Sequence, residues 1–230
     1  WDEILQGGLP EQATVMSWRG LEGGIEASNS GHDAVMTPGK YCYFDKYQGN
    51  PDVEPLAIGG LLPLDSVYGY SPSRGIAPEK AKHILGAQAN VWTEYIPTEK
   101  HFEYMVFPRL CAMAEILWSP AEKRNYVDFI QRLDTHYQRL DKKDIAYRVD
   151  APIGFQPYNR VLEDSTTVSL NCSIPSAEIR YTLDGTMPGR TSSLYTKPLQ
   201  LSLAANKKVI AKTFLKNGKE SKALTGVFEK

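Results

Sequence analysis

The spacing of the hydrophobic residues changes near residue 150, and this change constrains the fold more than any other feature of the sequence. Before it, short continuous apolar runs are separated by a stretch of helical character; after it, apolar and polar residues alternate. Continuous short runs are typical of strands buried on both faces of a parallel sheet, whereas alternation is typical of strands with one buried face. We therefore predict an α/β domain over residues 1–149 and an all-β domain over residues 150–230.

Three apolar runs predict the sheet of the first domain. They cover residues 13–18, 34–38 and 84–92, and residues 22–30 between the first two runs have helical character and stop at Gly31. A strand, a helix and a second strand form the repeating unit of a parallel sheet. The first domain is therefore predicted to contain parallel strands joined by helices.

Two longer helical stretches follow the third run. Residues 99–118 carry apolar side chains at roughly helical spacing, and Pro108 predicts a kink within them. Residues 119–122 (SPAE) have the pattern of a capping box with proline at the first helical position, and one apolar stripe follows them. This pattern predicts a second helix over about residues 120–143.

The second domain shows the alternation and the turn signals of a small all-β fold. Apolar residues alternate with polar ones near 168–172, 179–183 and 199–203, and the dipeptides DG at 184–185 and NG at 217–218 are strong hairpin signals. About six or seven short strands in a domain of this length are typical of an immunoglobulin-like β-sandwich. We predict that architecture for this domain.

Each of the three apolar runs in the first domain ends in aromatic or charged residues. Trp18 ends the first run, Tyr43 and Asp45 follow the second, and Trp92 ends the third and is followed by Glu94. In barrels of alternating strands and helices, the active site is assembled from loops at the carboxyl ends of the strands. The sequence therefore predicts that these loops line a pocket.

The composition excludes several classes of partner. The formal net charge is −1 and the 26 basic residues are scattered, so neither nucleic acid nor an anionic membrane surface is expected to bind. No apolar run approaches the length of a membrane-spanning helix. The histidines show no pair at ligand spacing and the cysteines lie far apart, so we expect no metal or other cofactor. Three buried free thiols are predicted: Cys42, Cys111 and Cys172.

Several motifs occur in a consistent order along the chain. They are WDEIL, VMSWRG, GHDAVMTP, YFD, GAQANVWTEY and FPRLCAMAEILWSP, with IRYTLDGTMPGRTSSLYTKPL in the second domain. Together they resemble the carboxyl-terminal part of family-twenty glycoside hydrolases, the β-N-acetylhexosaminidases and chitobiases, over essentially the whole chain. The resemblance implies the carboxyl-terminal part of a (β/α)8 TIM barrel followed by a small immunoglobulin-like β-sandwich.

The resemblance also implies roles for four aromatic residues. In this family the 2-acetamido oxygen of the sugar attacks the anomeric carbon, which differs from the usual pair of enzyme carboxylates. By similarity, Trp1, Trp18 and Trp92 form apolar walls around the acetamido methyl group and the pyranose ring. Tyr43 donates a hydrogen bond to the acetamido oxygen and so stabilises the developing oxazolinium ion.

The resemblance also implies roles for two carboxylates, but it leaves the acid/base role without a residue in this chain. Asp45 and Glu94 are expected to accept hydrogen bonds from sugar hydroxyls. The acid/base glutamate and the neighbouring aspartate of the family lie in an H-x-G-G-D-E type motif, which these 230 residues do not contain. The pair Asp2-Glu3 follows Trp1 in a piece that matches a later strand of the barrel, so it is not assigned this role.

We therefore expect the chain to be the carboxyl-terminal portion of a β-N-acetylhexosaminidase that acts on N-acetylhexosamine-containing glycans. We expect this portion to be inactive alone. Self-association or binding of the missing amino-terminal half of the barrel is predicted. Because family members that act on polymeric glycans are commonly exported, the expected location is periplasmic or extracellular. The alternative is a non-catalytic glycan-binding or docking module. Without the family pattern, core positions are favoured for Trp18 and Trp92, and a structural hydrogen-bonded pair is an alternative for Tyr43 and Asp45.

Overall fold

The computed structural model describes residues 1–230, which fold as two compact units. The first unit comprises Trp1–Phe129 and Ile145–Tyr147, and the second comprises Ile130–Asp144 and Arg148–Lys230. Most of the last helix is thus grouped with the second unit. The domain boundary between residues 149 and 150 stays a prediction. At the coarse level the fold is α/β followed by β, as the hydrophobic pattern indicates.

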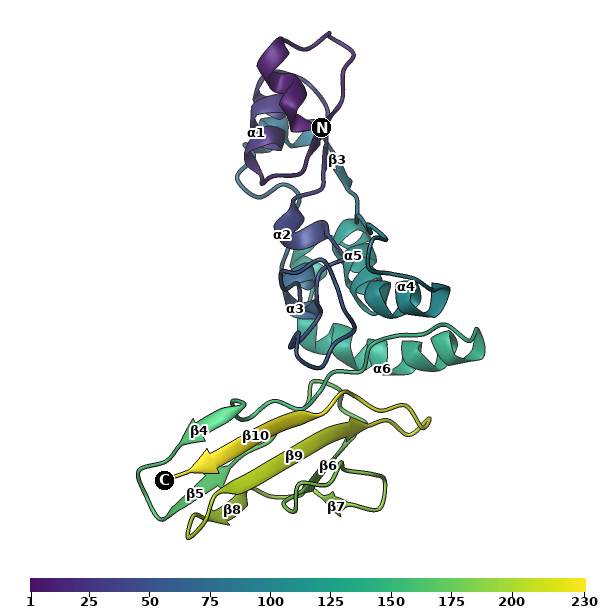
Figure 1. Cartoon of the computed structure of the whole chain (residues 1–230). Helices are drawn as coiled ribbons and strands as arrows, with labels where there is room; N and C mark the ends of the chain where they lie inside the picture. The colour runs from purple at the N-terminus through teal and green to yellow at the C-terminus, as the bar shows by residue number, and fades with distance from the viewer. The chain divides into compact units, whose positions relative to one another are not determined.

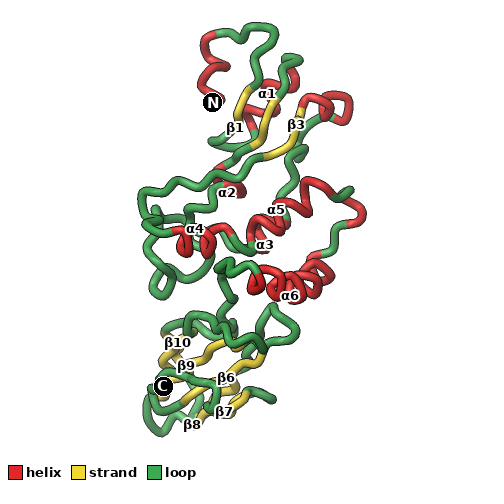
Figure 2. Tube along the Cα trace, turned by 90° about the vertical axis from the view of Figure 1, so that its right-hand side faces the viewer, coloured by secondary structure: helices red, strands yellow, loops and turns green.

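The first unit contains short strands, α-helices and 3-10 helices (η) in alternation (Figures 1 and 2). Its elements are η1 (Asp2–Gly7), β1 (Val15–Ser17), α1 (Glu22–Asn29), β2 (Ala34–Met36), α2 (Gly39–Cys42), α3 (Leu64–Tyr68), η2 (Pro78–His83), β3 (Ile84–Ala87), α4 (Glu99–Val106), α5 (Arg109–Trp118) and η3 (Ala121–Lys123).

The strands of the first unit form one parallel sheet in the order β1-β2-β3. Val15 pairs with Ala34, and Met36 pairs with Ala87. Helix α1 connects β1 to β2 and is followed by Gly31, whose φ of 83° lies in the left-handed region that favours glycine. The predicted order of strand, helix and parallel strand is confirmed.

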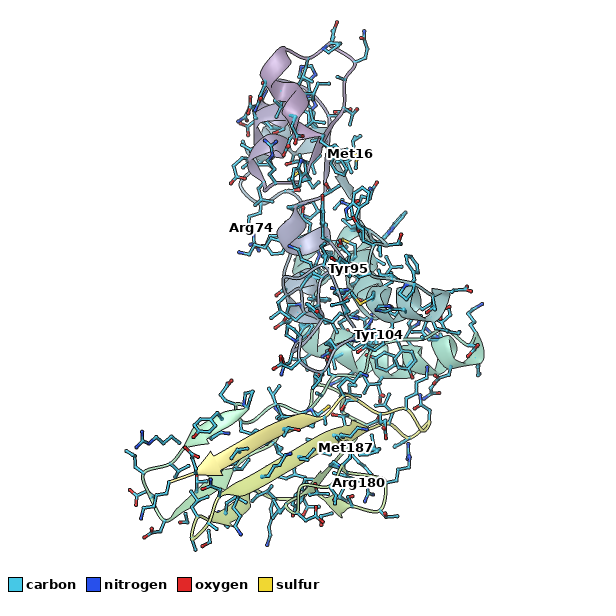
Figure 3. The ribbon with its side chains drawn as sticks, in the orientation of Figure 1. Met16, Arg74, Tyr95, Tyr104, Arg180 and Met187 are labelled. Carbon is cyan, nitrogen blue, oxygen red and sulfur yellow. The ribbon has the colours of Figure 1, made fainter.

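One face of this sheet is buried by α1 and the other is not. Gly24 of α1 lies so close to the sheet that an added Cβ would sit 2.2 Å from the sulfur of Met36, which explains the small residue at this contact. On the opposite face, Met16 (labelled in Figure 3) and Val35 are only half-buried, and Leu85 is 60% exposed. The prediction that all three strands are buried on both faces is therefore wrong for this chain, because no element of the 230 residues covers the second face.

The two longer helical predictions are right in type and wrong in their boundaries. Residues 99–118 form two helices, α4 and α5, separated by Phe107 and Pro108, instead of one kinked helix. The helix predicted from residue 120 begins later, as α6 (Tyr126–Lys142), after the short η3. The side-chain oxygen of Asn125 accepts a hydrogen bond from the Asp128 amide at 3.1 Å, so asparagine performs the capping expected of the SPAE motif.

The second unit contains seven strands in two sheets (Figure 1). They are β4 (Tyr158–Arg160), β5 (Ser165–Val168), β6 (Glu178–Thr182), β7 (Ser193–Leu194), β8 (Leu199–Ser202), β9 (Lys207–Phe214) and β10 (Leu224–Glu229). The order in the larger sheet is β4-β10-β9-β6-β7, and β5 pairs with β8 in the smaller one. All pairs are antiparallel except β4 with β10.

Apolar residues of both sheets form the core of the second unit. Val168 of β5 and Leu199 and Leu201 of β8 pack with Val209 of β9 and Phe228 of β10, which is the arrangement of a β-sandwich. The NG dipeptide lies between the paired strands β9 and β10, as predicted, in a connection that spans residues 215–223. The DG dipeptide also lies between paired strands, β6 and β7, in a connection that spans residues 183–192 (Met187 in Figure 3).

The three cysteines are free, as predicted, but only Cys42 is buried, whereas Cys111 and Cys172 are half-buried. Burial raises the pKa of Cys42 to about 12 and that of Cys111 to about 11, and it also raises the pKa of Cys172. None of the helices combines the length and the hydropathy that a membrane-spanning helix requires.

Candidate active site

A cavity of about 340 Å³ opens at the carboxyl ends of the strands in the first unit. Five of the six residues predicted for the site line this cavity, and Glu3 is an additional lining residue. Trp18 follows β1, Tyr43 lies beyond β2, and Trp92 and Glu94 lie beyond β3. These residues meet because parallel strands bring their carboxyl ends to one edge of the sheet. The roles of these residues in binding a sugar remain predictions.

The three indoles of the cavity form one continuous apolar wall. The ring of Trp1 lies 6.3 Å from that of Trp18, with an interplanar angle of 70°, and 6.4 Å from that of Trp92, with an angle of 49°. Trp1 therefore has an aromatic neighbour on each side. Because Trp1 and Trp92 are each 47% exposed, their faces are accessible to a ligand. This arrangement differs from that of buried core tryptophans.

Glu3 is the lining residue that the sequence did not identify. Its carboxylate accepts hydrogen bonds from the Trp18 indole nitrogen at 3.2 Å and from Arg19 at 2.6 Å. A backbone hydrogen bond within Glu3 lowers the pKa of this carboxyl, with further contributions from Trp18 and Arg19. Asp2 beside it is buried and accepts from the backbone amide of Trp18 at 3.3 Å. Both acids thus hold the end of β1.

Tyr43 is positioned by an extension of the pairing between β2 and β3. The Phe44 amide donates to the Asn90 carbonyl and the Asn90 amide donates to the Cys42 carbonyl, both at 2.8 Å, so Tyr43 and Asn90 form a parallel bridge. Burial and the charge of Asp45 raise the pKa of the Tyr43 phenol above its ordinary value. The hydroxyl is therefore protonated at neutral pH and is available as a hydrogen-bond donor.

Asp45 is the one predicted site residue that does not line the cavity. It is 4% exposed, and its Oδ1 atom has no hydrogen-bond partner. Burial raises the pKa of this carboxyl, while Lys46 and Arg109 act in the opposite direction. No hydrogen bond joins Asp45 to Tyr43, so the structure does not form the structural pair that these two residues suggest by themselves.

A buried arginine fixes the backbone on both sides of Asp45. Arg109, the first residue of α5, is fully buried and donates to the carbonyls of Phe44 and Lys46, the latter at 3.1 Å. It also donates to the Leu62 carbonyl at 3.1 Å, and its guanidinium lies 4.9 Å from the Phe44 ring centroid. Sequence periodicity did not reveal this role, because a charged residue is normally assigned to the surface of a helix.

The side chains around the cavity offer aromatic faces, a protonated phenol and carboxylates. No group of three or more histidine, cysteine, aspartate or glutamate side chains is placed so that it could hold a metal ion. Aromatic faces pack against the C–H surfaces of sugar rings, and carboxylates accept hydrogen bonds from hydroxyls. The class of site is therefore one that suits a carbohydrate.

Comparison with known proteins agrees with this class. Residues 1–121 match the family described as "Glycosyl hydrolase family 20, catalytic domain", and residues 158–225 match "Chitobiase/beta-hexosaminidase C-terminal domain". A beta-hexosaminidase from Porphyromonas gingivalis is 46% identical over 88% of this chain and 26% of that protein. A beta-hexosaminidase from Akkermansia muciniphila is 31% identical over 63% of this chain and 29% of that protein. The chain belongs to glycosyl hydrolase family 20.

Solved structures show the same relationship. The exo beta-N-acetylglucosaminidase of family 20 from Vibrio harveyi, in complex with N-acetylglucosamine, is 31% identical with a TM-score of 0.57, over 63% of this chain and 24% of that chain. The beta-N-acetylhexosaminidase from Streptomyces coelicolor A3(2), at 23% identity and a TM-score of 0.59, covers 65% of this chain and 32% of that chain and shows the fold alone. The chain thus spans about a quarter to a third of the length of these proteins.

Proposed function

We propose that this chain is part of a β-N-acetylhexosaminidase that removes terminal N-acetylhexosamine residues from glycans with retention of configuration. The observation that carries the proposal is the single cavity that brings together three indoles, the phenol of Tyr43 and the carboxylate of Glu94. The first unit would be the carboxyl-terminal part of a (β/α)8 barrel, and the second an immunoglobulin-like sandwich. The relatives named beta-hexosaminidase support the same activity.

The chemistry follows from the side chains of the cavity. The indole wall would exclude water from one side of the sugar and pack against its acetamido methyl group. The phenol of Tyr43 would donate to the acetamido oxygen while that oxygen attacks the anomeric carbon and the glycosidic bond breaks. The carboxylate of Glu94 would accept hydrogen bonds from sugar hydroxyls.

The uncovered face of the sheet supports the barrel proposal. Parallel sheets are covered on both faces in α/β proteins, yet Met16 and Val35 are half-buried and Leu85 is exposed on this face. A complete barrel has eight strands, and the first unit supplies three. We propose that further strands of the barrel, or a second copy of this chain, cover this face. Export to the periplasm or the cell exterior is proposed by analogy with enzymes that act on polymeric glycans.

The 230-residue chain alone is expected to bind N-acetylglucosamine without hydrolysing its glycosides. General acid catalysis contributes about two to four powers of ten in rate, and the H-x-G-G-D-E type motif that would supply the acid is absent from these residues. A chromogenic N-acetylglucosaminide assay measures turnover, and calorimetry with N-acetylglucosamine measures binding. Turnover comparable with that of intact family members would contradict the assignment of residues. Binding without turnover in a longer protein that also carries the acid would favour the non-catalytic module.

The isolated chain is expected to self-associate. The half-exposed sheet face and its unpaired strand edge favour association with another chain, since apolar surface and free backbone hydrogen-bonding groups are both available there. Light scattering at several concentrations is expected to give a mass above that of one chain. Leu85→Lys, which places a charge on the exposed face, is expected to shift the mass toward a single chain. A stable monomer of the unaltered chain would count against the barrel proposal.

A further inference from the structure

A buried amide lies beside the phenol of Tyr43. Asn90 follows β3, is 6% exposed, and forms a parallel bridge with Tyr43. Bridged residues of neighbouring extended segments place their side chains on the same side of the sheet, because successive side chains alternate between the two faces. The Asn90 amide therefore faces the same way as the Tyr43 ring, although it does not itself line the cavity.

A neighbouring glutamine fixes the orientation of this amide. The side-chain nitrogen of Gln88 donates to Oδ1 of Asn90 at 2.8 Å. Since Oδ1 is engaged by Gln88, the Nδ2 group points elsewhere, and this buried donor has no hydrogen-bond partner. Buried amide donors without a partner are rare and costly in folded proteins. The arrangement is understandable if Nδ2 acquires a partner during function.

The side chain bridged to Asn90 is that of Tyr43, whose phenol oxygen can accept a hydrogen bond. The side chains of Trp92 and Asn90 both act to lower the pKa of Tyr43, against the larger effects of burial and the charge of Asp45. This is the direction expected of donors that approach the phenol oxygen. Trp92 lines the cavity, whereas Asn90 is buried and does not line it.

We propose that Asn90 is a positioning residue for Tyr43. When the Tyr43 hydroxyl donates to the acetamido oxygen of an N-acetylhexosamine, Nδ2 of Asn90 donates to the phenol oxygen, and Gln88 holds the amide in the orientation that permits this. Each donor in the chain from Gln88 to Asn90 to Tyr43 to the acetamide polarises the next one. The inference rests on the proposed function, because it assigns a support to the residue that binds the acetamido group.

The first test measures the phenol directly. Tyr43 is replaced by a fluorotyrosine in the 230-residue chain, and its pKa is followed by fluorine NMR in the presence of Asn90, Asn90→Ala or Asn90→Asp. Loss of the donor is expected to raise the pKa by about 0.5 to 1 pH unit in Asn90→Ala, and by more in Asn90→Asp because of the added charge. An unchanged pKa in Asn90→Ala would overturn the proposal, because the charge added in Asn90→Asp raises the pKa in either case.

A second variant avoids the cavity that Asn90→Ala leaves in the buried region. Gln88→Glu removes the donor to Oδ1 and offers an acceptor, so the Asn90 amide is expected to turn its Nδ2 group toward the new carboxylate and away from Tyr43. The phenol pKa should rise here as well. Asn29→Asp is the matched control, since it adds the same charge at an exposed residue far from the carboxyl ends of the strands. Asn29 is the last residue of α1 and precedes the amino end of β2. No change is expected in this control.

The third test connects the amide to the ligand. Asn90→Ala is expected to weaken N-acetylglucosamine binding by about 2- to 10-fold in calorimetry, and this loss should disappear when Tyr43 is already phenylalanine. An equal loss in both backgrounds would show that Asn90 acts on folding or on another contact, and would overturn the proposal. If the unaltered chain binds no N-acetylglucosamine, the proposed function fails, while the titration of the phenol still decides the role of Asn90.

Discussion

Tyr43→Phe in the enzyme that carries this site is expected to lower kcat by about 10²- to 10³-fold, as is typical for removal of one donor to a developing charge. The backbone that carries the ring would stay in place, because the bridge to Asn90 does not involve the hydroxyl. KM should change much less, since the hydrogen bond strengthens as charge develops on the acetamido oxygen. A chromogenic N-acetylglucosaminide assay on the longer enzyme measures both constants.

The pH dependence of this effect has a defined direction. Burial raises the pKa of Tyr43, so the donor form persists below that pKa and is lost only as the pH rises through it. The ratio of unaltered to Tyr43→Phe rates is therefore expected to stay constant from pH 5 to pH 9. Tyr41→Phe is a suitable control, because Tyr41 stacks on Tyr70 at 4.8 Å and does not line the cavity. A Tyr43→Phe enzyme with a nearly unchanged kcat would contradict the assigned role.

The site could be predicted from the sequence to the extent that it depends on strand order. Trp18, Tyr43, Trp92 and Glu94 follow apolar runs, and parallel pairing alone brings the ends of such runs to one edge of a sheet. The family motifs then indicated Trp1, which lies before the first run. Trp1 completes the indole wall because the start of η1 lies at the end of β1. It is held there by Asp2, which accepts a hydrogen bond from the Trp18 amide.

Other features depend on contacts between distant residues and were not predictable from local patterns. Glu3 lines the cavity because it accepts hydrogen bonds from Trp18 and Arg19, which no spacing rule indicates. The orientation of Asn90 depends on Gln88 and on the register of β2 with β3. The late start of α6 arises because two capping signals lie close together: the SPAE motif comes first, but Asn125 caps the helix. In each case a short polar contact decided between structures that the hydrophobic pattern allowed equally.

Arg109 is the residue of the first unit whose replacement is expected to cost the most stability. It is fully buried, and its guanidinium serves the carbonyls of Phe44, Lys46, Leu62 and Met105. Methionine has a similar length and would fill much of the space, but it donates no hydrogen bonds. Several buried carbonyls would then lack a donor, and each such group costs about 1 to 3 kcal/mol. We expect Arg109→Met to lower the free energy of unfolding by about 3 to 5 kcal/mol.

Urea unfolding followed by tryptophan fluorescence measures this loss in the first unit, because all four tryptophans lie within it. Arg74→Met is the matched control: it makes the same exchange at an exposed arginine that donates to the Gly69 carbonyl at 2.9 Å (Figure 3), and it should cost less than about 1 kcal/mol. Similar losses in both variants would show that the backbone around Asp45 does not depend on Arg109. The bonds from Arg109 to the carbonyls of Phe44 and Lys46 fix the segment that carries Tyr43 and Asp45. A larger loss of stability in Arg109→Met than in the control would therefore be expected together with weaker N-acetylglucosamine binding, measured at urea concentrations where the variant is still folded. Both results together would show that this buried cation helps to place Tyr43 and Asp45.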